Sequence, residues 1–309
     1  MAVSFALKDG FLSSIDSELE HSLESVPNWS IDSSLLKPGK PVADDTTKLL
    51  VRDGSGVPYA VLVFSDETRG NLPVRGAAMS EKIRSASYGS VASSILSPLS
   101  YGNIRGVSYA LWPYRRPLTD LPLLRNFQRF VISRKAFTWL LQLTNQTKSI
   151  VSPALVEQRF IDPMRRLAAD RSVSEKVRAD LLFYASRAEE GSWRPMHVAE
   201  HGDLWLGNML VCRESDYSIA VIDWAGAKLE GHAMYDLSRL SRSLNVSTGF
   251  YRSQVRLHCA ELNCEFGDSL GYLLSSLARL SENLEHFPHS RFIQLLESTH
   301  RFHCESLGR

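Results

Sequence analysis

The chain has 309 residues, of which 44% are hydrophobic and 22% are charged, and its formal net charge is +1. A chain of this length can bury a large core, as one domain or as two lobes around a cleft, and its composition is ordinary for a globular enzyme. A net charge this close to zero gives no reason to expect a nucleic acid or an acidic membrane as a partner.

The cysteines and the start of the chain point to the cytoplasm. Cys212, Cys259, Cys264 and Cys304 form no C-x-x-C pair, so neither a zinc ribbon nor a redox motif is indicated. They are expected to be reduced, partly buried thiols. The sequence has no basic head followed by a long apolar run, and no apolar run approaches the roughly 20 residues that a membrane span needs. We therefore expect a cytoplasmic protein.

The first part of the chain is predicted to be rich in β-structure. Apolar residues at a helical spacing predict a helix over about 10–25. Two β-rich runs, 48–52 and 58–64, flank the turn residues 54–56 and predict a hairpin. The other elements predicted here are a helix near 76–94 and a strand near 107–112.

The rest of the chain is predicted to be mostly helical. Apolar residues recur every three or four positions from Phe127 to Thr144, which predicts one long amphipathic helix. Ser172, with Glu175 three residues later, predicts the start of a helix over 173–190. Further helical patterns lie near 154–169 and from about 233 onward. The order predicts an α+β fold with a small β-rich lobe, residues 1–114, and a larger helical lobe, residues 115–309.

One short β segment interrupts the helical part. The apolar runs 209–212 and 219–222 predict a hairpin with a four-residue loop. Its register places Asn208 opposite Asp223 at the open end, with Cβ atoms about 5 Å apart. An amide oxygen and a carboxylate at that separation can share one Mg²⁺ ion. Asp203 lies on the preceding loop, where its carboxylate can face the metal and hold a hydroxyl in line with a γ-phosphate.

These residues follow a spacing that phosphoryl transfer requires. The pattern His-x-Asp-x-x-x-x-Asn, with a later Asp, supplies a group that positions the nucleophile and accepts its proton, and two ligands for the metal. The fuller string found here, H-G-D-x-x-x-x-N, arises by chance in about one chain in a thousand of this length. The alternative, capping and turn roles in an ordinary hairpin, does not explain why three oxygen-bearing side chains converge.

The sequence HGDLWLGNML, followed by VIDWAGA and GHAMYDLSRL, resembles the aminoglycoside phosphotransferase/choline kinase superfamily. The resemblance is most specific over about 200–240. It implies a protein-kinase-like fold and Mg²⁺-dependent transfer of the γ-phosphoryl group of ATP or GTP. The implied acceptor is a hydroxyl of a small metabolite or an aminoglycoside-like molecule.

The resemblance also implies a role for each motif residue. Asp203 would be the catalytic base, and Asn208 and Asp223 would be the Mg²⁺ ligands. His201 would pack beneath the catalytic loop and hold its backbone. Asp236 would accept backbone N–H bonds from the loop while opening the helix that follows, which suits a short carboxylate before LSRL.

The small lobe departs from the family pattern at one position. Kinases of this type carry a lysine on the second strand of the small-lobe hairpin, paired with a glutamate on the next helix. Residues 61–64 are all apolar here, whereas Glu81 is a candidate for the glutamate. The strand lysine is therefore missing from its expected place.

Three interpretations of the missing lysine remain open. A register that pairs Arg52 with Tyr59 would put Lys48 beside Val63, within reach of the nucleotide, whereas a shift of one residue would turn it to the other face. Lys82 or Arg52 could serve instead. Otherwise the chain is a weak or inactive kinase, a pseudokinase that binds nucleotide as a regulator or scaffold.

The identity of the acceptor stays open at this level. Specificity is expected to come from the helical lobe after about residue 228. Four acidic residues could meet a cationic amino sugar or amine, or could be solvated surface: Glu230, Glu261, Glu265 and Asp268. The histidines near the end of the chain are expected at the surface, without a metal: His286, His289, His300 and His303.

Overall fold

The structure, a computed structural model, describes residues 11–32, 46–66, 71–116, 122–212, 218–285 and 287–308. These residues form two compact units. The first unit holds the described parts of Met1–Ser85, Ala92–Pro117 and Leu210–Ala225. The second holds those of Ala86–Val91, Leu118–Met209 and Gly226–Arg309. The single boundary predicted between residues 114 and 115 stays a prediction.

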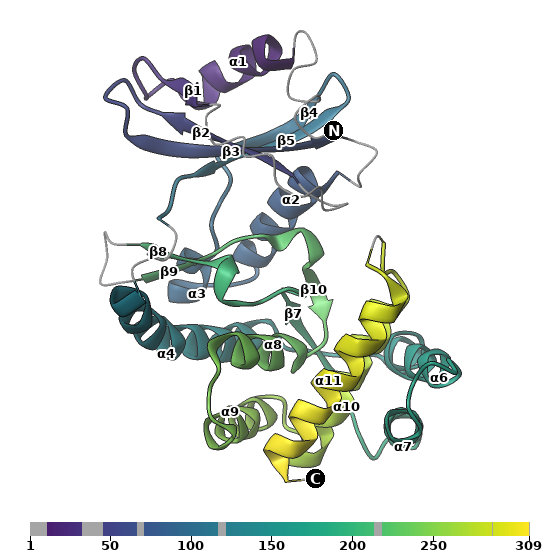
Figure 1. Cartoon of the computed structure of the whole chain (residues 1–309). Helices are drawn as coiled ribbons and strands as arrows, with labels where there is room; N and C mark the ends of the chain where they lie inside the picture. The colour runs from purple at the N-terminus through teal and green to yellow at the C-terminus, as the bar shows by residue number, and fades with distance from the viewer. Residues whose placement is uncertain are drawn as a thin grey trace. The chain divides into compact units, whose positions relative to one another are not determined.

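An antiparallel sheet of five strands, in the order β1-β2-β3-β5-β4, is the centre of the first unit (Figure 1). The hairpin and the strand near 107–112 are confirmed as β2, β3 and β5, but β1 and β4 were not predicted because both are short and largely polar. The strands are β1 (Ser30–Asp32), β2 (Thr47–Arg52), β3 (Pro58–Asp66), β4 (Ser100–Ile104) and β5 (Val107–Pro113).

The register of the β2–β3 hairpin agrees with the prediction at Lys48, which lies opposite Val63. A bulge between Val51 and Arg52 places Arg52 opposite Pro58 instead of Tyr59. The bulge lies at the turn end of the hairpin, so it leaves the pairing of Lys48 unchanged. Lys48 therefore lies on the strand next to the position of the missing lysine.

Helices cover both faces of this sheet (Figure 1). Helix α1 (Phe11–Ser22) contributes Ile15 and Leu19 to a buried core with alternate residues of the strands, Leu49 among them. Helix α2 (Leu72–Ser85) packs on β3, β4 and β5. Since successive strand residues face opposite sides, Lys48 lies on the face away from α1. The helix predicted near 76–94 is in fact two helices, α2 and α3 (Gly89–Ser94).

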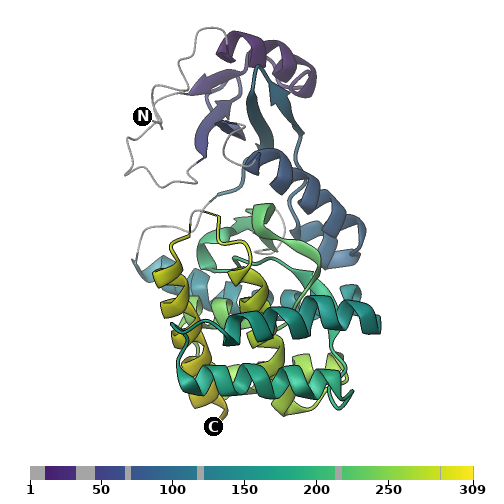
Figure 2. The same ribbon diagram turned by 90° about the vertical axis from the view of Figure 1, so that its right-hand side faces the viewer.

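Helices make up most of the second unit, as predicted, and Figure 2 shows the teal helices α6 and α7 side by side. Helix α7 begins after Ser174, whose hydroxyl accepts a bond from the Val177 N–H, so the predicted start at Ser172 is wrong.

None of the described helices is long and apolar enough to cross a membrane. The helices are α4 (Pro122–Thr147), α5 (Pro153–Val156), α6 (Asp162–Ala168), α7 (Glu175–Glu189), α8 (Tyr235–Leu244), α9 (Thr248–Glu261), α10 (Ser269–Ser281) and α11 (His289–Leu307).

Short strands connect these helices and lead into the motif. β7 (Met196–Glu200) pairs with β6 (Ser149–Ile150) and with β10 (Lys228–Gly231). β7 ends immediately before His201, and β10 leads into α8. The predicted hairpin is confirmed as β8 (Met209–Cys212) paired with β9 (Ser218–Val221).

Candidate active site

The loop that follows β7 turns sharply at Gly202, which has a φ of +79°. A side chain there would be strained, because L residues rarely adopt this conformation, and an added Cβ would lie 3.0 Å from the Gly226 carbonyl oxygen. His201 is completely buried and its Nδ1 lies 3.3 Å from the Asp203 N–H nitrogen, as an acceptor. The loop is thus fixed by its own backbone and by one buried ring.

The carboxylate of Asp236 holds this loop from the first turn of α8. It accepts the N–H of His201 at 2.6 Å and the N–H of Gly202 at 3.0 Å. Burial raises the pKa of Asp236 to about 6, although backbone N–H groups of the loop, including that of Leu204, oppose the shift. These bonds tie the position of α8 to the position of the loop.

Asp203 and Asn208 are in direct contact. The amide nitrogen of Asn208 donates to the Asp203 carbonyl oxygen at 2.9 Å and to its carboxylate at 3.2 Å. Asn208 closes a 3₁₀ turn over Leu206–Asn208 and is buried, whereas 43% of the Asp203 side chain is exposed. The arrangement presents one oriented carboxylate to solvent beside one oriented amide.

Arg239 is a further residue of the site, and the motif did not predict it. Its guanidinium forms an ion pair with the Asp203 carboxylate. Arg239 comes three residues after Asp236, and residues at this spacing share one face of a helix. That spacing in DLSRL is the signal that could have placed Arg239 beside the loop.

A pocket of about 410 Å³ opens beside this ion pair. The Leu206 N–H donates to the Ser243 hydroxyl at 3.1 Å, which fastens one wall of the pocket to the loop that carries Asp203. The pocket is lined by residues of the loop, of α8 and of α11: Trp205, Tyr235, Arg239, Arg242, Ser243, Leu295 and Thr299.

Three other predicted site residues lie in the first unit. Lys48 is exposed on β2, and Glu81 lies on α2. The Glu81 carboxylate accepts a bond from the Tyr101 hydroxyl at 2.7 Å, and no ion pair between the described Lys48 and Glu81 is formed. Tyr101 pairs with Ala110, which pairs with Val63, the partner of Lys48, so the four residues form one row across the sheet. Lys48 and Glu81 therefore belong to the same side of the sheet.

Asp223 follows β9 and is also in the first unit. It is exposed and has a φ of +69°, a left-handed conformation that Asp tolerates better than most residues. Next to it, Trp224 is completely buried and donates its indole N–H to the Val221 carbonyl oxygen at 3.0 Å. The buried indole fixes the backbone that carries the Asp223 carboxylate.

The alternative basic residue Arg52 is engaged elsewhere. Its guanidinium binds Asp32 at 2.9 Å and the Gly56 carbonyl oxygen at 2.8 Å, near the hairpin turn. Lys82 is exposed on α2. Of the three candidates, Lys48 is the one that lies directly beside the expected lysine position.

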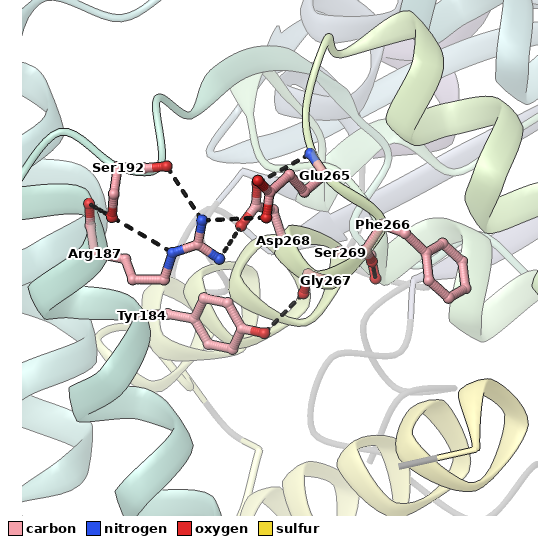
Figure 3. A network of polar contacts seen from close by, with 8 residues as sticks. All are labelled: Tyr184, Arg187, Ser192, Glu265, Phe266, Gly267, Asp268 and Ser269. Atoms are coloured by element: carbon pink, nitrogen blue, oxygen red, sulfur yellow. Dashed lines mark hydrogen bonds and ion pairs between the residues drawn. The ribbon is translucent and has the colours of Figure 1, made fainter.

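Each acidic residue considered for a cationic acceptor has a basic partner in the protein. Glu230 pairs with Arg159, and Glu261 pairs with Lys148. Figure 3 shows Arg187 between Glu265 and Asp268, with the Asp268 carboxylate 2.7 Å from the guanidinium. Asp268 is buried, so this pair is part of the fold. All four acidic residues that could have met a cationic acceptor thus form ion pairs within the protein: Glu230, Glu261, Glu265 and Asp268.

The surface position predicted for the C-terminal histidines is wrong for two of them. His300 and His303 are buried, and their rings bind Asp180 and Tyr251 respectively. His289 is exposed, and His286 lies outside the described residues. The two buried histidines lie on the inner face of α11. The polar sequence of this helix gave no indication that they are buried.

Comparisons with known proteins agree with this architecture. The sequence model described as the phosphotransferase enzyme family matches residues 91–280. No curated protein sequence matches the chain significantly.

Solved structures resemble the chain over nearly its whole length. One is an ethanolamine kinase of Plasmodium vivax, at 12% identity and a TM-score of 0.53, covering 96% of this chain and 89% of that one. Another is a thermostable mutant of the aminoglycoside phosphotransferase APH(4)-Ia in its apo form, at 15% identity and a TM-score of 0.51, covering 92% and 98%. A further point mutant of that thermostable phosphotransferase, in a ternary complex with AMP-PNP and hygromycin B, matches at 14% identity and a TM-score of 0.50, covering 94% and 98%. These likenesses confirm the predicted α+β, protein-kinase-like fold class.

Proposed function

Because the chain belongs to the phosphotransferase enzyme family, we propose that it is a small-molecule kinase that transfers the γ-phosphoryl group of ATP or GTP to a hydroxyl of a small acceptor. The acceptor oxygen forms a new bond to the γ-phosphorus as the bond from phosphorus to the bridging oxygen breaks. The nucleoside diphosphate leaves with that electron pair, and the hydroxyl proton passes to Asp203. Catalysis of this kind depends on positioning and on charge stabilisation.

Asp203 orients the acceptor hydroxyl and receives its proton. Arg239 and Asn208 bind the Asp203 carboxylate, and 43% of its side chain is exposed beside them. The exposed part of the side chain can therefore accept a bond from an acceptor hydroxyl. A positioned base of this kind contributes roughly 10²- to 10⁴-fold to the rate.

Asn208 and Asp223 are the residues that would hold Mg²⁺. Both offer oxygen ligands, which this ion requires, and the Asn208 amide nitrogen donates to Asp203, which leaves the amide oxygen for a cation. Bound Mg²⁺ neutralises charge on the transferring phosphate. His201 and Asp236 act as supports, because the bonds described above hold the loop backbone on which Asp203 lies.

Lys48 would bind the nucleotide phosphates in place of the missing strand lysine. Its position opposite Val63 supports this role, and Glu81 on the same side of the sheet would orient it once released from Tyr101. The bond between Glu81 and Tyr101 is also the observation that favours the second candidate, a pseudokinase. In a pseudokinase the lysine–glutamate pair would not form.

The single observation that carries the proposal is the loop held by Asp236, with Asp203 and Asn208 in contact on it. The test measures consumption of MgATP and MgGTP with a panel of hydroxyl compounds, for the wild-type chain, Asp203→Ala and the control Glu190→Ala. Glu190 is an exposed carboxylate of the same unit. We expect Asp203→Ala to lose at least 100-fold in turnover while nucleotide binding is kept, and Glu190→Ala to behave as wild type.

Two results would contradict the proposal. Nucleotide binding by the wild-type chain without turnover of any acceptor favours the pseudokinase. Full activity of the Asp203→Ala variant would show that Asp203 is not the catalytic base.

A further inference from the structure

The charge of the pocket beside Asp203 is positive. Arg239 and Arg242 are three residues apart on α8 and both line it. The other lining residues are uncharged. The carboxylate of Asp203 lies next to the pocket, where it forms an ion pair with Arg239.

Arg242 keeps its positive charge without a carboxylate partner. Its guanidinium donates to the Thr299 hydroxyl at 2.9 Å and to the Ser298 hydroxyl at 3.3 Å. Among residues placed in the structure, no carboxylate lies within ion-pair distance of it. Neutral hydroxyls orient a guanidinium but do not compensate its charge. Arg242 is thus held in place by α11 with its charge available to a ligand.

The Arg239 guanidinium also has an N–H donor that makes no hydrogen bond to the described residues. Its Nε is buried and has no hydrogen-bond partner within the described part of the chain. Because this Nε is shielded, a ligand in the pocket meets the exposed part of the guanidinium instead, and 32% of the Arg239 side chain is exposed. The guanidinium can bind Asp203 through one edge and a ligand through another, because it carries five N–H donors.

The acidic residues that a cationic acceptor would need are absent from this pocket. Glu230, Glu261 and Asp268 are paired with Arg159, Lys148 and Arg187, and none of these lines the pocket. An amino sugar or a quaternary amine would meet two arginines there. The repulsion would disfavour such acceptors.

We propose that the acceptor carries an anionic oxygen group, a carboxylate or a phosphate, together with the hydroxyl that is phosphorylated. The anionic group binds Arg242 and the exposed part of the Arg239 guanidinium, and the hydroxyl reaches Asp203. The inference rests on the proposed kinase function for the identity of the pocket. The anion site itself follows from the two arginines and can be tested without turnover.

The test uses acceptor pairs that differ in charge. Glucuronate and glucose 6-phosphate are compared with glucose and glucosamine, glycerate with glycerol, and serine with ethanolamine. Binding is measured by calorimetry and turnover by release of nucleoside diphosphate. The variants are Arg242→Ala, Arg242→Glu and the control Arg301→Ala, an exposed arginine on α11 that does not line the pocket.

We expect at least one anionic member to bind and to be phosphorylated in preference to its neutral or cationic counterpart. Arg242→Ala should raise the KM for that acceptor roughly 10- to 100-fold, the range for loss of one charged hydrogen-bonded contact, with the KM for nucleotide unchanged. Arg242→Glu should shift the preference toward the amines. Arg301→Ala should match wild type. The sugar acid and the sugar phosphate distinguish a carboxylate from a phosphate ligand.

The outcomes separate the two proposals. Anion binding that depends on Arg242 but gives no turnover keeps the anion site and refutes the kinase function. Turnover of neutral or cationic acceptors that is insensitive to Arg242→Ala keeps the kinase function and refutes the anionic acceptor. Failure of every anionic member to bind refutes the anion site directly. A rise in the KM for nucleotide alone would assign Arg242 to the nucleotide, contrary to the inference.

Discussion

Replacement of Gly202 by alanine is expected to damage both stability and catalysis. The residue has a φ of +79° and donates its N–H to Asp236 at 3.0 Å. An L residue in this conformation costs about 1–2 kcal/mol. The added Cβ would also stand 3.0 Å from the Gly226 carbonyl oxygen, a backbone atom that cannot rotate away.

A matched control separates the two contributions. Gly191 has a similar φ of +73°, but a Cβ added there meets nothing within 4 Å. Gly191→Ala should therefore lower the free energy of unfolding by about 1–2 kcal/mol through conformation alone. Gly202→Ala should lower it by about 2–5 kcal/mol, because crowding of a packed site adds roughly 1–3 kcal/mol.

The assay combines urea unfolding with turnover. Because relief of the contact must move the loop that carries Asp203, kcat of Gly202→Ala should fall on the order of 10- to 100-fold. Gly191→Ala should retain kcat. The reasoning is refuted if the two variants unfold with the same free energy and Gly202→Ala keeps full activity.

Three further variants test other parts of the structure. Lys48→Ala should raise the KM for nucleotide roughly 10- to 100-fold while Lys82→Ala stays near wild type, and the reverse pattern would reassign the phosphate contact. Arg187→Ala should lower the free energy of unfolding by about 3 kcal/mol, because it leaves a buried carboxylate unpaired, whereas Arg165→Ala, from an exposed pair, should cost less than about 1 kcal/mol in the same urea titration. Burial lowers the pKa of His258 to about 4, so the unfolded chain takes up a proton below about pH 6.5 before the folded chain does. Stability should therefore fall as pH drops from about 6.5 to 4, by up to about 3 kcal/mol, and His258→Leu should lose this part of the pH dependence; an unchanged pH profile would contradict the assignment.

Local patterns made much of the fold predictable. The β2–β3 hairpin has two apolar runs around a turn, which predicted both strands, whereas the register that pairs Lys48 with Val63 was one of two that the sequence left open. The motif spacing likewise predicted that Asp203 and Asn208 lie close together, because residues on one short loop stay close in any fold that forms it.

Other features depend on contacts between distant segments and left no local signal. The ion pair between Arg239 and Asp203 requires α8 to lie against the loop, and an arginine on a polar helix face ordinarily suggests solvent. His300 and His303 occupy the inner face of α11 with polar partners, so their burial could not be read from hydrophobicity. The strand β4 was missed because its sequence is polar and contains a glycine.

If the acceptor binds in the pocket as proposed, the bonds from Asp236 to the loop limit how acceptor preference can diverge. The helix that anchors the loop also carries Arg239 and Arg242, so a substitution that repacks α8 for a new acceptor would displace Asp203 as well. Helix α11 contributes Leu295 and Thr299 to the same pocket, whereas the carboxylate that holds the loop lies on α8. Related chains with altered acceptors are therefore expected to vary along α11 while α8 stays nearly constant. Engineered changes of acceptor specificity should therefore begin on α11.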